Sequence, residues 1–83
     1  MEKRLGFVGI IVENRDECAQ NVNSILSDCG DLIVARTGVP YKKKNCCVIT
    51  LVVDATTDEL GRLTGKLGSI AGVTVKSALS KGK

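Results

Sequence analysis

The feature of this sequence that most constrains its fold is an order of patterns that occurs twice. An apolar extended run at residues 4–12 is followed by helical spacing over 14–29 and by a second extended run at 31–39. A third apolar run at 46–54 is followed in the same way by a helical stripe over 56–70 and a β-branched run at 73–79. The resulting order, β-α-β-β-α-β, is typical of an α+β, ferredoxin-like two-layer sandwich. Right-handed crossovers place both helices on one face of a four-stranded antiparallel sheet, with the strand order 4-1-3-2.

The ends of the expected helices carry recognisable signals. Asn14 and Thr56 each stand where a side chain can accept a hydrogen bond from a backbone N–H three residues on, and a glutamate follows each at that distance. Gly30 and Gly72 suit the left-handed residue that ends a helix. Pro40 is expected to stop the second strand before a polar turn.

The two central strands are apolar on both faces. In the first strand one face carries Leu5, Phe7 and Ile11, and the other carries Val8, Ile10 and Val12. The strand at 46–54 is similar, yet a two-layer sandwich covers only one face of its sheet. An uncovered aliphatic face of this size is unfavourable on a monomer. We therefore expect a homo-oligomer, either a dimer or a tetramer built as a dimer of dimers.

Four glycines recur along the second helical stretch. Gly61, Gly65, Gly68 and Gly72 are spaced four, three and four residues apart, which places them on one stripe. Each of the first three costs a helix about 1 kcal/mol relative to alanine. Their presence indicates either close approach to the other helix or the sheet, or a surface where a partner subunit or small ligand meets bare backbone. A phosphate loop is excluded, since only three residues separate Gly61 from Gly65 and a leucine follows Lys66.

Composition limits the available chemistry. The 83 residues contain no histidine, and the four cysteines (Cys18, Cys29, Cys46 and Cys47) form no C-x-x-C pair. We expect buried thiols in a reducing compartment, with a redox or iron–sulfur role and disulfides as the alternatives, and no cofactor or metal site. The net charge of +3 is mild, and no apolar run is long enough to span a membrane. The expectation is one domain over residues 1–83, located in the cytoplasm.

Several motifs together resemble a known family. They are VENR at 12–15 with NVNSIL at 21–26, RTGVP at 36–40, and TGKLGSIAGVTVKS at 64–77. On these motifs nearly the whole chain resembles the small ACT-like proteins that are named as regulators of the iron-only hydrogenase system. The resemblance implies a regulatory role tied to that hydrogenase or its maturation, with a protein of that system as a possible partner. ACT-like domains usually form dimers and bind small molecules, often amino acids, near the loop after the first strand and at subunit interfaces. The Pro-Gly that many amino-acid-binding ACT domains carry in this loop is absent here.

The favoured function is a non-enzymatic regulatory or sensor module that binds a small ligand or partner protein at an oligomer interface. The candidate polar contacts are Asn14, Arg15 and Lys66, and Gly65 and Gly68 would give access to the backbone. The alternative for Asn14 is a helix cap alone, and for Arg15 and Lys66 a solvated surface.

Two other function classes stay open. An acylphosphatase-like enzyme would use Arg15 to hold phosphate, although neither a glycine-rich cradle nor a nucleophile–base pair accompanies it. A nucleic-acid-binding protein would use Lys42–Lys44 and the lysines near the C-terminus. No DNA-binding helical motif is present, so a solvated hairpin is the favoured interpretation of the lysines.

Overall fold

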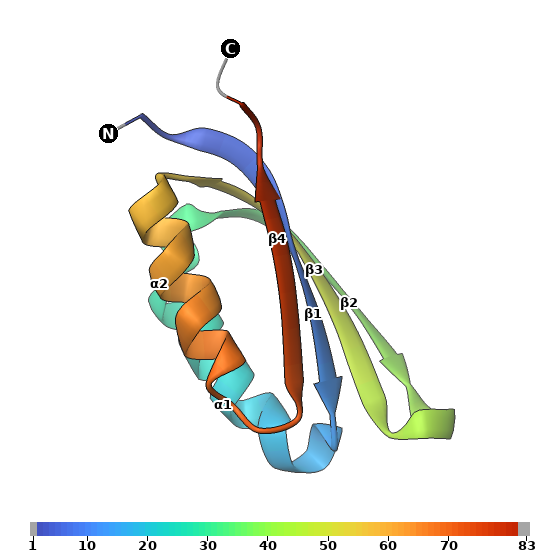
Figure 1. Cartoon of the computed structure of the whole chain (residues 1–83). Coiled ribbons are helices and arrows are strands. Elements are labelled where there is room, and N and C mark those ends of the chain that lie inside the picture. Colours follow the sequence, from blue (N-terminus) through green and yellow to red (C-terminus); the bar gives the residue numbers. More distant parts are fainter. Residues whose placement is uncertain (1, 82–83) are drawn as a thin grey trace.

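The structure, a computed structural model, describes residues 2–81, except for the side chains of residues 15–18. Its elements are β1 (Arg4–Glu13), α1 (Arg15–Asp28), β2 (Ile33–Tyr41), β3 (Cys46–Ala55), α2 (Thr57–Gly68) and β4 (Val73–Leu79), with 3-10 turns at Gly30–Leu32 and Lys42–Lys44. All strand pairs are antiparallel, and the sheet order is β2-β3-β1-β4. Both helices lie on one side of the sheet (Figure 1). The expected ferredoxin-like sandwich and its strand order are confirmed.

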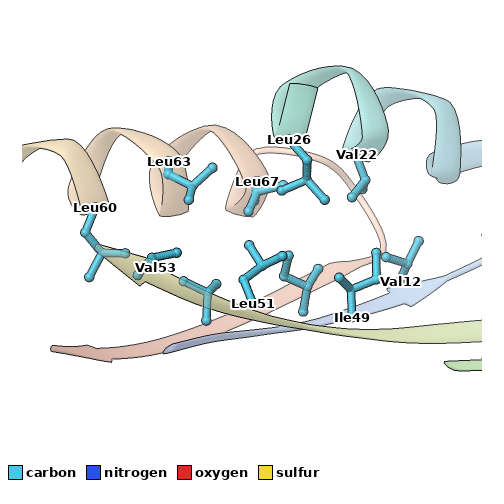
Figure 2. Packing of buried hydrophobic residues seen from close by; sticks show 11 residues of the cluster. Val12, Val22, Leu26, Ile49, Leu51, Val53, Leu60, Leu63 and Leu67 are labelled. Atoms are coloured by element: carbon cyan, nitrogen blue, oxygen red, sulfur yellow. The ribbon is translucent and has the colours of Figure 1, made fainter. Parts of the chain in front are cut away.

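The core lies between the sheet and the helices, because alternate side chains of the central strands point to the helical side. Its strand members are Val8, Ile10 and Val12 on β1 and Ile49, Leu51 and Val53 on β3. Its helical members are Val22 and Leu26 on α1 and Leu60, Leu63 and Leu67 on α2. Figure 2 shows these helical side chains pointing towards the strands. The cluster is entirely aliphatic, as the near absence of aromatic residues predicts.

The two helices begin differently. At α2 the Thr56 hydroxyl accepts from the Glu59 N–H at 3.1 Å, and the Glu59 carboxylate accepts from the Thr56 N–H at 2.9 Å. At α1 the predicted Asn14 cap is wrong, because no side-chain cap hydrogen bond forms. Asn14 has φ 52° and ψ 55°, and this left-handed conformation differs from the extended one of an N-cap. Asparagine tolerates that conformation better than most residues, so it serves the turn instead.

The ends of both helices also differ from the sequence prediction. Gly30 does not end α1 with a left-handed residue, since only Gly72 among the described glycines has a positive φ, 83°. The helix ends at Asp28, and a 3-10 turn follows. Gly72 does take the left-handed conformation, but it lies in the loop before β4, after α2 has ended at Gly68.

The strand β2 continues through Pro40, contrary to the prediction that proline stops it. Pro40 pairs with Cys47, and β2 ends one residue later at Tyr41. Proline fits here because β2 is an edge strand, where a missing N–H removes no interior hydrogen bond. The pairing of β2 with β3 also shifts register between Ile33 and Ala35, as in a β-bulge.

In the described residues, no helix has the length and apolar composition that a membrane span requires.

Candidate functional site

The sheet surface opposite the helices is mostly apolar. We call it the open face and define it by Leu5, Phe7, Ile11, Val39, Tyr41, Val48 and Val52. Each of these side chains is between 40% and 59% exposed, whereas Val8, Ile10 and Leu51 on the other side of the same strands are fully buried. The expected apolar character of both sides of the central strands is therefore present in the structure.

Strand pairing gathers the open face into two apolar groups, separated by a row in which Thr37, Thr50, Gly9 and Lys76 pair across the sheet. Phe7 pairs with Val52, Ile11 pairs with Val48, and Val48 pairs on its other side with Val39. These residues lie on β1, β3 and β2, so the apolar surface crosses three strands. At one end a hollow of about 400 Å³ is lined largely by Leu5, Phe7 and Val52 together with β4. Apolar surface of this kind is unfavourable in water when it is left uncovered.

The glycine stripe of α2 faces solvent. A Cβ added at Gly61, Gly65 or Gly68 would meet no other atom within 4 Å, with the helix's own nearby backbone set aside. All three residues are exposed. Close approach to the other helix or the sheet, one of the two explanations drawn from the sequence, is therefore wrong. The glycines leave the backbone of α2 accessible from outside.

Lys66 and the nearby glycines Gly65 and Gly68 do not line the same surface hollow. The Lys66 side chain lines two surface hollows between α2 and its neighbours, one shared with Ser24 on α1 and the other with Asp28 and Glu59. Gly65 and Gly68 line neither hollow. The structure therefore does not bring the lysine and the glycines together into one concave site.

The turn between β1 and α1 lies beside the loop between α2 and β4. The Glu13 N–H donates to the Gly72 carbonyl oxygen at 2.8 Å, and both segments sit at the lower end of the molecule in Figure 1. Asn14 is exposed in this turn, while the side chain of Arg15 lies outside the described residues. Asn14 is thus close to the loop that follows the glycine stripe.

The pKa of one carboxyl group is perturbed. The pKa of Glu59 is lowered, first by the backbone hydrogen bond at Thr56 and then by the ammonium group of Lys3, whose Nζ lies 3.5 Å from a Glu59 oxygen. Partial desolvation opposes this effect. The shift belongs to the start of α2, so it is explained by capping.

A cavity of about 220 Å³ lies under α1 beside the edge strand β2. It is lined by Val12, Ala19, Val22, Asn23, Arg36, Gly38, Pro40, Cys47 and Ile49. Arg36 pairs with Leu51 and Gly38 with Ile49, so both stand on the helical side of the sheet. Neither residue supplies an apolar side chain that would fill the space between β2 and α1. The cavity exists because this part of the helical side of the sheet is left unfilled.

Sequence reasoning missed Arg36 and Asn23. The Nη2 of Arg36 donates to the Oδ1 of Asn23 at 3.1 Å across the mouth of this cavity. The available signal was a charged residue and a glycine at alternate positions of β2, on the side where the other strands carry valine, isoleucine or leucine.

The lysines of the β2–β3 hairpin are exposed in the 3-10 turn Lys42–Lys44, which Asn45 closes with φ 50°. Within the described chain, no three side chains of His, Cys, Asp or Glu gather in a group that could hold a metal ion.

A model of the TM1266-like family, described as "Iron-only hydrogenase system regulator, putative", matches residues 4–77. The chain belongs to this family. The solved structure of the uncharacterized protein TM1266 from Thermotoga maritima is 39% identical in sequence, with a TM-score of 0.92. That match covers 96% of this chain and 100% of the other. A comparison with curated protein sequences gives no match. The family resemblance drawn from the motifs is confirmed.

More distant structures share the fold of this TM1266-like chain. The ACT domain of GTP pyrophosphokinase from Chlorobium tepidum is 24% identical, with a TM-score of 0.73, and the match covers 92% of this chain and 99% of that one. CPII from Thiomonas intermedia K12, a nitrogen regulatory PII-like protein, is 16% identical, with a TM-score of 0.56, and the match covers 92% and 90% of the two chains. The ACT-like form of the fold is thus confirmed.

Proposed function

We propose that this protein is a small non-enzymatic regulatory module that works as a homo-oligomer and binds a small ligand or a partner protein at its subunit interface. The open face carries this proposal. Its seven large hydrophobic residues stay at least 40% exposed on a single chain, which is unfavourable in water. Membership of a family described as hydrogenase system regulators supports the regulatory role.

A second copy of the chain is the occupant that best fits the open face. The longest dimensions of the molecule, 41 and 18 Å, bound a face of about 740 Å², close to the roughly 800 Å² per partner of a standard interface. The contact would be isologous, with the open faces of two copies stacked on each other, and two such dimers would form the tetramer.

The proposed ligand contacts are Asn14, Arg15, Gly65, Lys66 and Gly68. Support comes from the exposed backbone of the glycine stripe and from the closeness of the Asn14 turn to the α2–β4 loop. In this proposal a ligand or partner contacts the backbone of α2 at the glycines, and Lys66 supplies a positive charge at the edge of that contact.

The physiological partner in this proposal is a protein of the hydrogenase system, and the site of action is the cytoplasm. The described cysteines Cys29, Cys46 and Cys47 are free thiols, which is compatible with a reducing compartment.

The oligomer is tested by native mass spectrometry and sedimentation of the freshly purified protein. We expect a dimer or tetramer, and a small molecule carried through purification would appear as added mass. Phe7→Glu places a charge on the open face and should yield single subunits that keep the far-ultraviolet spectrum of the wild type. Gln20→Glu is the matched control, because it adds the same charge at an exposed position of α1 on the helical layer, away from the open face. A wild type that stays a single subunit at high concentration, or a Phe7→Glu variant that assembles normally, contradicts the proposal.

A further inference from the structure

We propose that the cavity under α1 binds a small carboxylate with a short branched apolar tail, held by Arg36. The cavity opens between α1 and the edge strand β2, on the helical side of the sheet. It shares no residue with the open face, and it contains none of Asn14, Gly65, Lys66 or Gly68. The inference therefore stands independently of the oligomer and of the proposed contacts on α2.

Arg36 is the anion-binding element. Among the described side chains, Arg36 has no carboxylate within ion-pairing distance, and its one hydrogen bond goes to Asn23. A guanidinium group has five N–H donors in a planar fork, and most of those of Arg36 have no partner among the described side chains. That fork matches the two oxygens of a carboxylate. The hydrogen bond from Arg36 to Asn23 holds the fork at the mouth of the cavity.

The inner wall selects an apolar tail. Val12, Val22 and Ile49 are nearly or fully buried and belong to the core, and Ala19 adds a methyl group from α1. Gly38 contributes no side chain, and a Cβ built there would meet nothing within 4 Å. The empty space at Gly38 is thus the part of the cavity that a branched tail would fill.

Size and charge restrict the ligand further. The volume of about 220 Å³ is roughly seven times the share of one water molecule in the liquid. A five-carbon acid such as isovalerate suits this volume, whereas a nucleotide does not. The described lining residues include no aspartate or glutamate that could receive an ammonium group. A simple carboxylate should therefore bind better than the amino acid of the same shape.

The first experiment titrates the wild-type protein with sodium isovalerate at physiological salt and follows backbone amide shifts by NMR. We expect saturable binding in the millimolar range, with the largest shifts at Arg36, Gly38 and Cys47. Isovaleramide, which has the same shape without the charge, and L-valine should each bind at least tenfold more weakly. No saturable shift with isovalerate, or tighter binding of L-valine or isovaleramide, overturns the proposal.

Two variants locate the binding. Arg36→Gln removes the charge but keeps a donor for Asn23, and it should weaken isovalerate binding at least tenfold. Arg62→Gln removes the same charge from α2 and should leave binding unchanged. Gly38→Val fills the cavity in a strand that accepts β-branched residues, and it should abolish binding without lowering the melting temperature. Thr37→Val, on the opposite side of the same strand, is its control. Unchanged binding in both cavity variants overturns the proposal, whatever the oligomeric state.

Cysteine alkylation gives an independent readout. Cys47 lines the cavity, and its neighbour Cys46 points to the other side of β3. Isovalerate should slow the reaction of Cys47 with iodoacetamide and leave the rates at Cys46 and Cys29 unchanged. Equal rates at Cys47 with and without saturating isovalerate contradict a ligand in this cavity.

Discussion

Replacing two glycines of α2 by alanine should stabilise the protein. Gly61 and Gly65 lie inside the helix, and their φ angles are not positive. An added Cβ would meet nothing within 4 Å at either position, so no steric cost opposes the change. Alanine is better than glycine in a helix interior by about 0.8–1.0 kcal/mol. The double variant Gly61→Ala/Gly65→Ala should therefore gain about 2 kcal/mol in free energy of unfolding.

The gain is large enough to measure by thermal and urea denaturation. For a domain of 60–100 residues, about 1 kcal/mol shifts the melting temperature by roughly 4–8 °C, so a rise of about 8–16 °C is expected. Both proteins must be compared at one subunit concentration, because assembly also contributes to stability. Gly72→Ala is the control and should lower the free energy of unfolding, since φ 83° strains any residue with a side chain.

An unchanged or lower stability of the double variant would refute the reasoning. It would mean that the folded protein needs bare backbone at these positions, through a contact that the single chain does not contain. If the double variant is more stable but no longer binds its ligand or partner, the glycines serve binding and lower the stability of the wild type.

Other predictions concern the sheet and the start of α2. Gly6→Ala should destabilise the protein by about 1–3 kcal/mol, because the added Cβ would collide with the carbonyl oxygen of Ala78. Gly9→Ala is the control that should be tolerated, since its Cβ would have its nearest neighbour at 3.9 Å. Equal unfolding curves for the two variants would contradict this prediction. Thr56→Ala should cost about 1 kcal/mol in chemical denaturation through loss of the cap, and a cost near zero would show that the cap is dispensable. The pKa of Glu59 is lowered by folding, so its contribution to stability is present above the ordinary pKa of about 4.5 and is lost as the pH falls through the folded-state pKa. Glu59→Gln should flatten that acid limb of a pH–stability curve, and an identical limb in wild type and variant would refute the assignment.

The parts of the fold that depend on periodicity could be predicted from the sequence, and those that depend on local backbone geometry could not. The alternation along β1 and β3 and the leucine stripe of α2 set the strand order and the core, because burial of apolar faces dominates the energetics. The same capping pattern was assigned to Asn14 and Thr56, yet only Thr56 caps its helix. Which of two similar turns adopts the extended conformation depends on neighbouring segments, here the loop at Gly72 that bonds to Glu13.

The candidate sites show a similar division. The apolar open face follows directly from alternation in the sequence, so it was foreseen. The sequence left two explanations for Gly61 and Gly65, close packing or an exposed backbone, since spacing alone does not say which side of a helix meets a neighbour. The cavity at Arg36 and Gly38 depends on how α1 packs against the sheet beside β2, and that placement is a property of the packed molecule.

The edge strand β2 has a consequence for how copies of this protein can associate. Pro40 removes one backbone donor from β2, and the register shift near Ala35 disturbs its other half. A strand of another molecule therefore has no regular ladder to extend along this border. Growth of the sheet from chain to chain, the route to open-ended fibrils, is hindered on that side, and closed assemblies of few subunits are favoured.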